Sequence, residues 1–172
     1  MNKLQRDLCK VIQAIASIED FEQFGQNSAI RYGFLNYVAK YSLAADTYFA
    51  TPIARAYLEE NGFLTKRGLR RGRKSKANGF TYEHAIPANV VADEILRKPG
   101  SADHIATTLL KTDVVTILTT EENEMLSGPL RAKMPDGWVL ESGDVYARYT
   151  SIGLVASHAQ LHSVSVYGAI AR

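Results

Sequence analysis

Helical periodicity fills most of the first hundred residues, and two-residue alternation appears mainly in the last third of the chain. Residues 2–18 repeat apolar side chains at a spacing near 3.6, and Thr51 followed by Pro52 has the residue types of a helix start. Residues 145–157 and 161–171 alternate in part, as strands do. Helices first and strands last are typical of an α+β protein. We expect a helical N-terminal half, a basic arm, and a small, mainly antiparallel sheet with helices packed on one face.

The length of the chain, 172 residues, favours a single domain. We expect a helical part over 1–62, a basic arm over 63–79 and a mixed α/β part over 80–172. No run of 18 apolar residues occurs, so we expect no membrane span and no membrane partner. Cys9 is the only cysteine, which fits a reducing, cytoplasmic location, and its place in an apolar pattern predicts a core position.

A cluster of basic side chains interrupts an otherwise mildly acidic chain. Seven cations lie between residues 66 and 76 with no acid among them, so of the net charge of +2 this stretch supplies +7 and the rest −5. Such a local stripe is typical of proteins that bind polyanions. We therefore predict a nucleic-acid partner, DNA or RNA, whose backbone is bound by Lys66, Arg67, Arg70, Arg71, Arg73, Lys74 and Lys76.

The first candidate for chemistry follows directly on this stretch, in "TYEHAIP". Glu83 and His84 stand at the end of an expected short strand that Pro87 terminates. Neighbouring residues on a strand point to opposite faces, so both reach one substrate only if the strand ends between them. Histidine is the natural general base near neutral pH, and His84 is therefore a candidate catalytic residue.

The second candidate is the segment "VVTILTTEENEML". Its first part is the clearest strand in the chain, because it is short, apolar and β-branched. Thr119 and Glu122 then have the spacing of a capping box at a helix start. The strand delivers Glu121, Glu122 and Asn123 to the first turn of that helix, where their oxygen atoms are candidate ligands that could meet His84 across a shared cleft.

Residues 80–127 resemble the HNH-type (ββα-metal) endonucleases. "YEHAIP" is similar to the first element of that family, and "VTILTTEEN" is similar to its later strand and helix. The resemblance implies that His84 activates a water molecule as general base. It also implies that Glu83 and Asn123 hold a divalent metal such as Mg²⁺, which stabilises the phosphate and the leaving oxygen.

A third candidate lies in "YARYTSIG", which we expect to form a strand. Arg148 could stabilise charge on a phosphate, and Tyr149 could stack on a base or donate a proton. With Glu83 and His84 these residues would suit a metal-independent ribonuclease of the kind found in small bacterial toxins. Metal-dependent and metal-independent cleavage therefore both remain open.

The function indicated first is a small endonuclease, a hydrolase in which His84 is the general base and the basic arm holds the nucleic-acid backbone. Two functions without catalysis are the alternatives. One is a nucleic-acid-binding protein similar to winged-helix modules, with the helix over 51–61 for recognition. The other is a protein that binds another protein and inhibits a nucleic-acid-processing complex.

Overall fold

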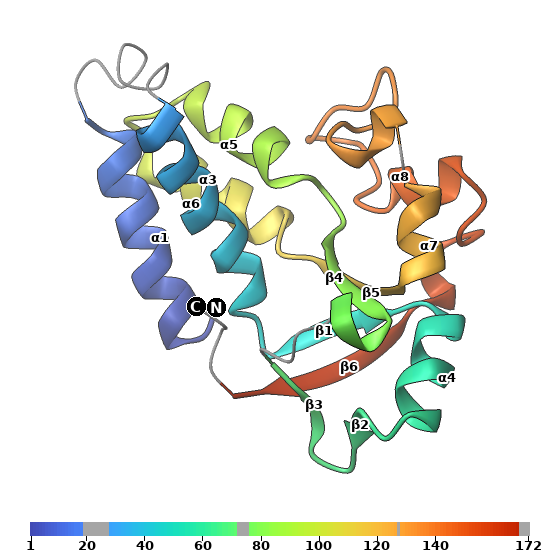
Figure 1. Ribbon diagram of the computed structural model, residues 1–172. Coiled ribbons are helices and arrows are strands. Elements are labelled where there is room, and N and C mark those ends of the chain that lie inside the picture. Colours follow the sequence, from blue (N-terminus) through green and yellow to red (C-terminus); the bar gives the residue numbers. More distant parts are fainter. Residues whose placement is uncertain (19–27, 72–75, 127, 169–172) are drawn as a thin grey trace. The chain divides into compact units, whose positions relative to one another are not determined.

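The computed structural model describes residues 1–18, 28–71, 76–126 and 128–168 (Figure 1). Helices and strands mix as expected for an α+β protein, which confirms the predicted class. The chain divides into two compact units, one of residues 1–45 with 87–113 and the other of residues 46–86 with 114–172. No helix of the described ranges is long and apolar enough to cross a membrane.

The first unit is helical. Its helices are α1 (Lys3–Ala16), α3 (Ser28–Leu43), α5 (Ala88–Leu96) and α6 (Ala102–Lys111). The side chains of Asn2 and Gln5 form a capping box at the start of α1. Cys9 is buried as predicted, but the inner face of α1 also includes Gln5, while Leu4 is exposed.

A buried polar contact lies where α1 meets the end of α6. Gln5 Nε2 donates to Asp113 Oδ2 at 2.6 Å, and the ring of Tyr41 is fully buried in the same unit. Burial raises the pKa of the Asp113 carboxyl to about 6, and the hydrogen bond from Gln5 reduces the shift only in part. This carboxyl therefore titrates closer to neutral pH than an ordinary aspartate.

The second unit contains a curled six-stranded sheet. Its strands are β1 (Thr47–Ala50), β2 (Leu64–Thr65), β3 (Gly68–Arg70), β4 (Phe80–His84), β5 (Val115–Thr119) and β6 (His162–Tyr167), in the spatial order β2-β3-β6-β1-β5-β4. The pairs β1–β5 and β3–β6 are parallel and the other three are antiparallel, so the sheet is mainly antiparallel as predicted. Strand β1, which lies between β6 and β5, was not predicted from the sequence.

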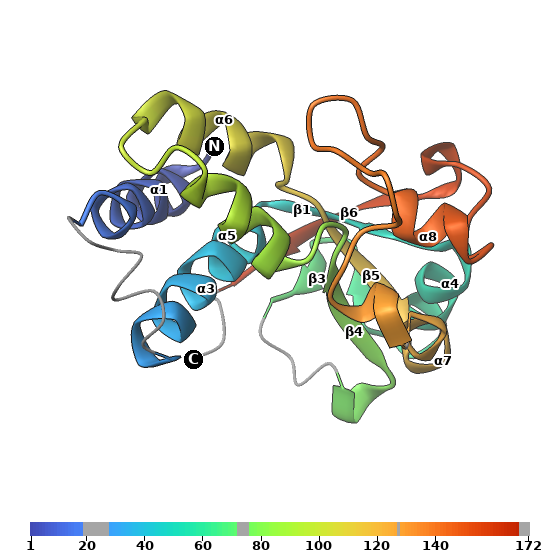
Figure 2. The ribbon, with the colours of Figure 1, turned by 90° about the horizontal axis from the view of Figure 1, so that it is seen from above.

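The two ends of this sheet approach one another. The ring centroids of Phe63, just before β2, and Phe80, in β4, are 5.3 Å apart. Tyr57 on α4 (Pro52–Glu60) donates its hydroxyl to the carbonyl of Asn78, which precedes β4, at 3.0 Å. Figure 2 shows the strands β1, β3, β4, β5 and β6 of this sheet from above. Asn78, near the end of the basic arm, and Phe80, just after it, are therefore held against α4 and Phe63.

The remaining elements of the second unit are short. They are α7 (Thr120–Met125), α8 (Ala147–Ser151) and the 3₁₀ turns η1 (Lys76–Asn78), η2 (Gly128–Arg131) and η3 (His158–Gln160). The strand expected around residues 145–157 is wrong, because Arg148 and Tyr149 lie in α8. Alternation in "VYARYTSIGLV" reflects a one-turn helix and a following loop that bury Tyr146, Arg148, Tyr149 and Val155.

Candidate functional site

A polar pocket opens beside β4 and α7. Its volume is about 410 Å³, and Phe80, Thr81, Glu83, Thr120, Asn123, Glu124, Leu126 and Arg131 line it. Glu83 and Asn123, which the sequence analysis selected as ligands from two distant segments, thus share one pocket. Glu124 and Arg131 were not selected. Arg131 lies in η2, within a stretch that carries no recognisable motif, so only the fold reveals its position.

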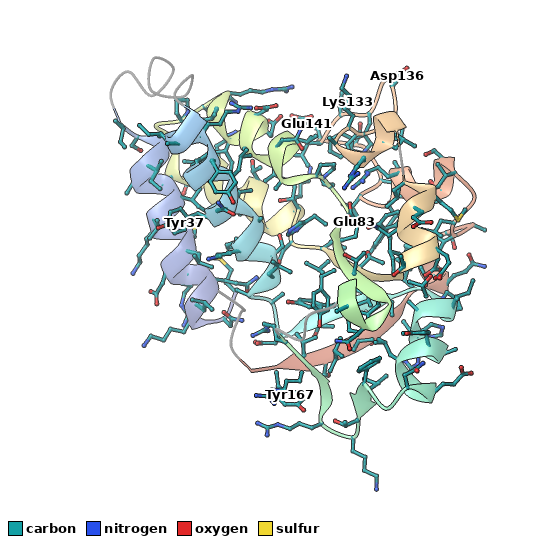
Figure 3. The ribbon with its side chains drawn as sticks, viewed as in Figure 1. Tyr37, Glu83, Lys133, Asp136, Glu141 and Tyr167 are labelled. Carbon is teal, nitrogen blue, oxygen red and sulfur yellow. The ribbon has the colours of Figure 1, made fainter. Side chains whose placement is uncertain are left out.

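The alternation of β4 separates Glu83 from His84. Because β4 extends through His84, the strand does not end between the two residues, and they point to opposite faces. Tyr82, on the His84 face, packs its ring edge-on against Tyr48 at 5.5 Å. Figure 3 shows where Glu83 lies on β4. His84 is not among the pocket-lining residues, so its catalytic role stays a prediction that the pocket does not support.

Glu83 forms an ion pair with a fully buried arginine. Arg148 Nη2 donates to Glu83 Oε1 at 3.0 Å, and the Arg148 side chain has no exposed surface while that of Glu83 is 24% exposed. The Glu83 carboxylate therefore contacts the buried Arg148 and also lines the open pocket. Buried pairs of this kind hold their partners in one geometry, and loss of either partner is costly.

Three further hydrogen bonds of the Arg148 guanidinium go to backbone carbonyls. Nε donates to Leu130 at 2.7 Å, Nη1 to His84 at 2.9 Å, and Nη2 also to Arg131 at 3.2 Å. Arg148 therefore fastens η2, which carries Arg131, to the end of β4, which carries Glu83. Its burial places it behind the pocket wall, where it positions other groups and does not contact solvent.

Burial also sets the proton affinities at this site. Burial raises the pKa of the Glu83 carboxyl, and the guanidinium groups of Arg148 and Arg131 counteract this only in part. The pKa of His84 shifts in the opposite direction. Burial lowers it to about 4, with a smaller contribution from Arg148. Tyr149 is fully buried, and burial raises the pKa of its phenol. Near neutral pH His84 is uncharged and Tyr149 keeps its proton.

The Glu122 carboxylate makes its hydrogen bonds within the fold. It is buried, and its Oε2 accepts from the Thr119 backbone N–H at 2.9 Å and from the Thr51 hydroxyl at 2.8 Å. Thr119 and Glu122 form the capping box that the sequence predicted. The Glu122 carboxylate therefore joins the starts of α7 and α4 and does not line the pocket.

The residues present do not suit the divalent metal that the HNH-like resemblance implies. Glu83 already binds the guanidinium of Arg148, and Arg131 lines the same pocket. A metal cation there would be repelled by both positive charges. In the described part of the chain, no group of three or more His, Cys, Asp or Glu side chains is placed to hold a metal ion. The pocket instead combines the carboxylates of Glu83 and Glu124 with the guanidinium of Arg131.

The basic arm is divided between exposed and engaged cations. Lys66, Arg67 and Arg70 are exposed on the β2–β3 hairpin. Arg71 pairs with Asp46 at 3.6 Å and donates to the Gly168 carbonyl at 2.9 Å, so it helps to hold the hairpin against the end of β6. Arg73 and Lys74 lie outside the described residues, as does the side chain of Lys76.

Comparisons with protein-family models, with curated proteins and with solved structures find no match to this chain. The resemblance to HNH-type endonucleases therefore stays a hypothesis that rests on the sequence segments alone. Function has to be argued from the pocket and from the basic surface.

Proposed function

We propose that this protein is a metal-independent ribonuclease whose reaction takes place in the pocket of Glu83, Asn123 and Arg131. One observation supports this most directly: a carboxylate with a raised pKa and an arginine line the same open pocket. A general base works best when its pKa approaches the working pH, and an arginine stabilises the charge that develops on a phosphate. This pair is sufficient for phosphoryl transfer when the substrate supplies its own nucleophile.

RNA supplies that nucleophile as the 2′-hydroxyl. In the described part of the chain Arg148 is the hydrogen-bond partner of Glu83 and binds Oε1, so a substrate hydroxyl would bind Oε2. Glu83 takes the proton of the 2′-hydroxyl, and the 2′-oxygen then forms a bond to phosphorus. The bond from phosphorus to the 5′-oxygen breaks, and that oxygen takes a proton from water. The products are a 2′,3′-cyclic phosphate and a 5′-hydroxyl end.

Arg131 and Arg148 have different parts in this proposal. Arg131 contacts the phosphate and stabilises the extra negative charge of the five-coordinate transition state. Arg148 is a positioning residue, because it holds Glu83 by a side-chain bond and η2 by the Leu130 and Arg131 carbonyls. Asn123 offers an amide to the ribose or to a non-bridging phosphate oxygen.

Cleavage of a fluorescent RNA in the presence of EDTA tests the proposal. Glu83→Gln and Arg131→Gln are each expected to lower the rate by about 10² to 10⁴-fold. Glu121→Gln is the matched control. Glu121 is exposed on α7, the helix that carries Asn123, and it does not line the pocket. Products that carry a 2′,3′-cyclic phosphate identify the reaction. Cleavage of plasmid DNA that requires Mg²⁺ would overturn the proposal in favour of the HNH-like reading.

A non-catalytic nucleic-acid-binding role is the second candidate. The exposed cations of the β2–β3 hairpin favour it, because they attract a phosphate backbone without requiring the pocket. Retention of RNA without cleavage, unchanged by Glu83→Gln, would favour this role. An absence of both binding and cleavage would favour a protein partner.

A further inference from the structure

A second groove lies at the other edge of the sheet from the pocket. It has a volume of about 370 Å³ and is bounded by α4, the β2–β3 hairpin and β6. Its polar lining includes Arg55 and Glu59 of α4, Lys66 and Arg67 of the hairpin, and Ser163 and Ser165 of β6. Figure 3 shows Tyr167, at the end of β6, well away from Glu83. The groove is therefore a separate site from the candidate active site.

The floor of this groove is the polar face of β6. Val164 and Val166 are buried, while Ser163 and Ser165 are exposed, as the two-residue period of a strand requires. Tyr167 follows on the same face as the two serines. The exposed face of β6 thus presents two hydroxyl groups and then an aromatic ring.

The hairpin at the rim of the groove is held rigidly. Gly68 has a φ of +106°, and a Cβ at this position would overlap the carbonyl oxygen of Ser165, so the backbone of the hairpin rests directly on β6. Thr65 Oγ1 donates to the Gly68 carbonyl at 2.9 Å and accepts from the Arg67 N–H at 3.2 Å. The position of Arg67 is therefore fixed by its own turn.

Arg67 is stacked on an aromatic ring. Its guanidinium carbon lies 4.5 Å from the centre of the Tyr167 ring, and its side chain is exposed. The guanidinium is therefore an exposed cation held against the tyrosine ring. Arginine planes and aromatic rings are the surfaces on which unpaired bases of RNA stack.

The charge of the groove is positive. Glu59 is its acidic residue, and this carboxylate pairs with Arg55 at 2.9 Å along α4. Lys66 and Arg67 remain on the rim beside the hydroxyls of Ser163 and Ser165. Hydroxyl groups and cations are the contacts that proteins make with phosphate oxygens.

We propose that this groove binds single-stranded RNA, with a backbone phosphate between Lys66 and the serines of β6 and an unpaired base stacked on Arg67. The inference rests on the proposed function for the identity of the substrate and deepens it by specifying unpaired RNA. Duplex RNA fits poorly, because its bases are paired and stacked on one another and cannot stack on Arg67. In the reaction the groove lowers KM for long substrates and leaves kcat unchanged.

The binding test uses a probe that cannot be cleaved, a fluorescein-labelled 12-mer of 2′-O-methyl uridine. The double variant K66Q/R67Q is expected to bind it at least 10-fold more weakly than the wild type. K10Q/K98Q is the control, because it removes the same charge from exposed lysines of the helical unit. R67K keeps the positive charge but loses the planar guanidinium. It should recover less than half of the binding free energy that K66Q/R67Q loses. The two engaged cations, Lys66 and Arg67, give a log–log salt slope of about −1.4 on a single strand.

Three outcomes would overturn the inference. They are equal affinity of K66Q/R67Q and wild type, equal affinity for the single strand and a matched duplex, and a poly-glutamate competitor that displaces the probe at equal charge concentration. The test does not depend on catalysis, because the probe lacks a free 2′-hydroxyl. If the wild type binds the probe but never cleaves RNA, the proposed ribonuclease activity fails while the groove stands. If the protein cleaves RNA but K66Q/R67Q and K10Q/K98Q bind the probe equally well, the groove proposal fails while the ribonuclease activity stands.

Discussion

The hydroxyl of Thr51 donates to Glu122 Oε2 at 2.8 Å, so one carboxylate is shared by the caps of two helices. Thr51 Oγ1 also accepts from the Ala54 N–H at the start of α4, and Glu122 Oε2 also accepts from the Thr119 N–H at the start of α7. Both side chains are buried. The starts of α4 and α7 are therefore stabilised by one network and not by separate caps.

Replacement of Thr51 should cost more than the loss of an ordinary cap. We expect Thr51→Val to lower the free energy of unfolding by about 2 to 3 kcal/mol, because it removes the cap and leaves a buried carboxylate oxygen with one donor fewer. Ser101→Ala is the matched comparison, since Ser101 caps α6 through the His104 N–H alone and should cost about 1 kcal/mol. Urea denaturation measures both. Equal costs would show that the bond to Glu122 contributes nothing.

Arg148 should be among the least replaceable residues of the chain. We expect Arg148→Met to lower the free energy of unfolding by about 3 to 5 kcal/mol, because Glu83 would lose its buried partner and three carbonyls would lose a donor. Arg31→Gln, which breaks an exposed ion pair with Asp93, should cost less than about 1 kcal/mol. A double-mutant cycle with Glu83→Gln should give a coupling energy of about 1 to 3 kcal/mol. Additive costs would contradict the pairing.

The helices could be predicted from local signals in the sequence. Thr51 with Pro52, Ser101, and Thr119 with Glu122 are start signals whose residues act within one turn, and the structure has a helix at each. The strand β5 could also be predicted, because an apolar, β-branched run of five residues has few other solutions. These features depend on neighbours in the chain and not on the fold.

The candidate site could be predicted only in part. Glu83 and Asn123 stand at strand and helix positions that local patterns locate, and the sheet brings them together. Arg131 and the buried setting of Arg148 depend on contacts between segments far apart in the chain, which leave no periodic trace. Arg148 was assigned to a strand because "VYARYTSIGLV" alternates in part, but these residues form a short helix and a loop that bury Tyr146, Arg148, Tyr149 and Val155. Single-sequence patterns do not distinguish these cases.

Asp113 should make the protein less stable as pH rises through mildly acidic values. Its pKa is raised from 3.8 to about 6 in the folded chain, so the folded state holds a proton that the unfolded state has lost. The free energy of unfolding should therefore fall between about pH 4 and pH 6, by about 1 to 2 kcal/mol once solvent screening is included. Asp113→Asn should remove this fall. A variant curve parallel to that of the wild type would show that Asp113 is not the group responsible.

His84 should act in the opposite direction over an overlapping range. Its pKa is lowered from 6.5 to about 4, so the unfolded chain binds a proton before the folded chain does. The free energy of unfolding has the full contribution of uncharged His84 above about pH 6.5. It falls as pH drops towards 4, again by about 1 to 2 kcal/mol. His84→Asn should flatten this loss while RNA cleavage persists if Glu83 is the base. Loss of cleavage in a His84→Asn protein of normal stability would restore His84 as the catalytic candidate.

Gly143 should be required for the packing of Trp138, the single tryptophan of the chain. Trp138 Nε1 donates to the Asp144 carbonyl at 2.9 Å, and a Cβ at position 143 would overlap the indole ring and the Val139 carbonyl. Gly143→Ala must therefore displace the ring, and we expect the fluorescence emission to move to longer wavelength as the indole enters water. Gly100→Ala is the control, because a Cβ there meets no atom within 4 Å. An unchanged spectrum in Gly143→Ala would mean that the loop between η2 and α8 packs differently around Trp138.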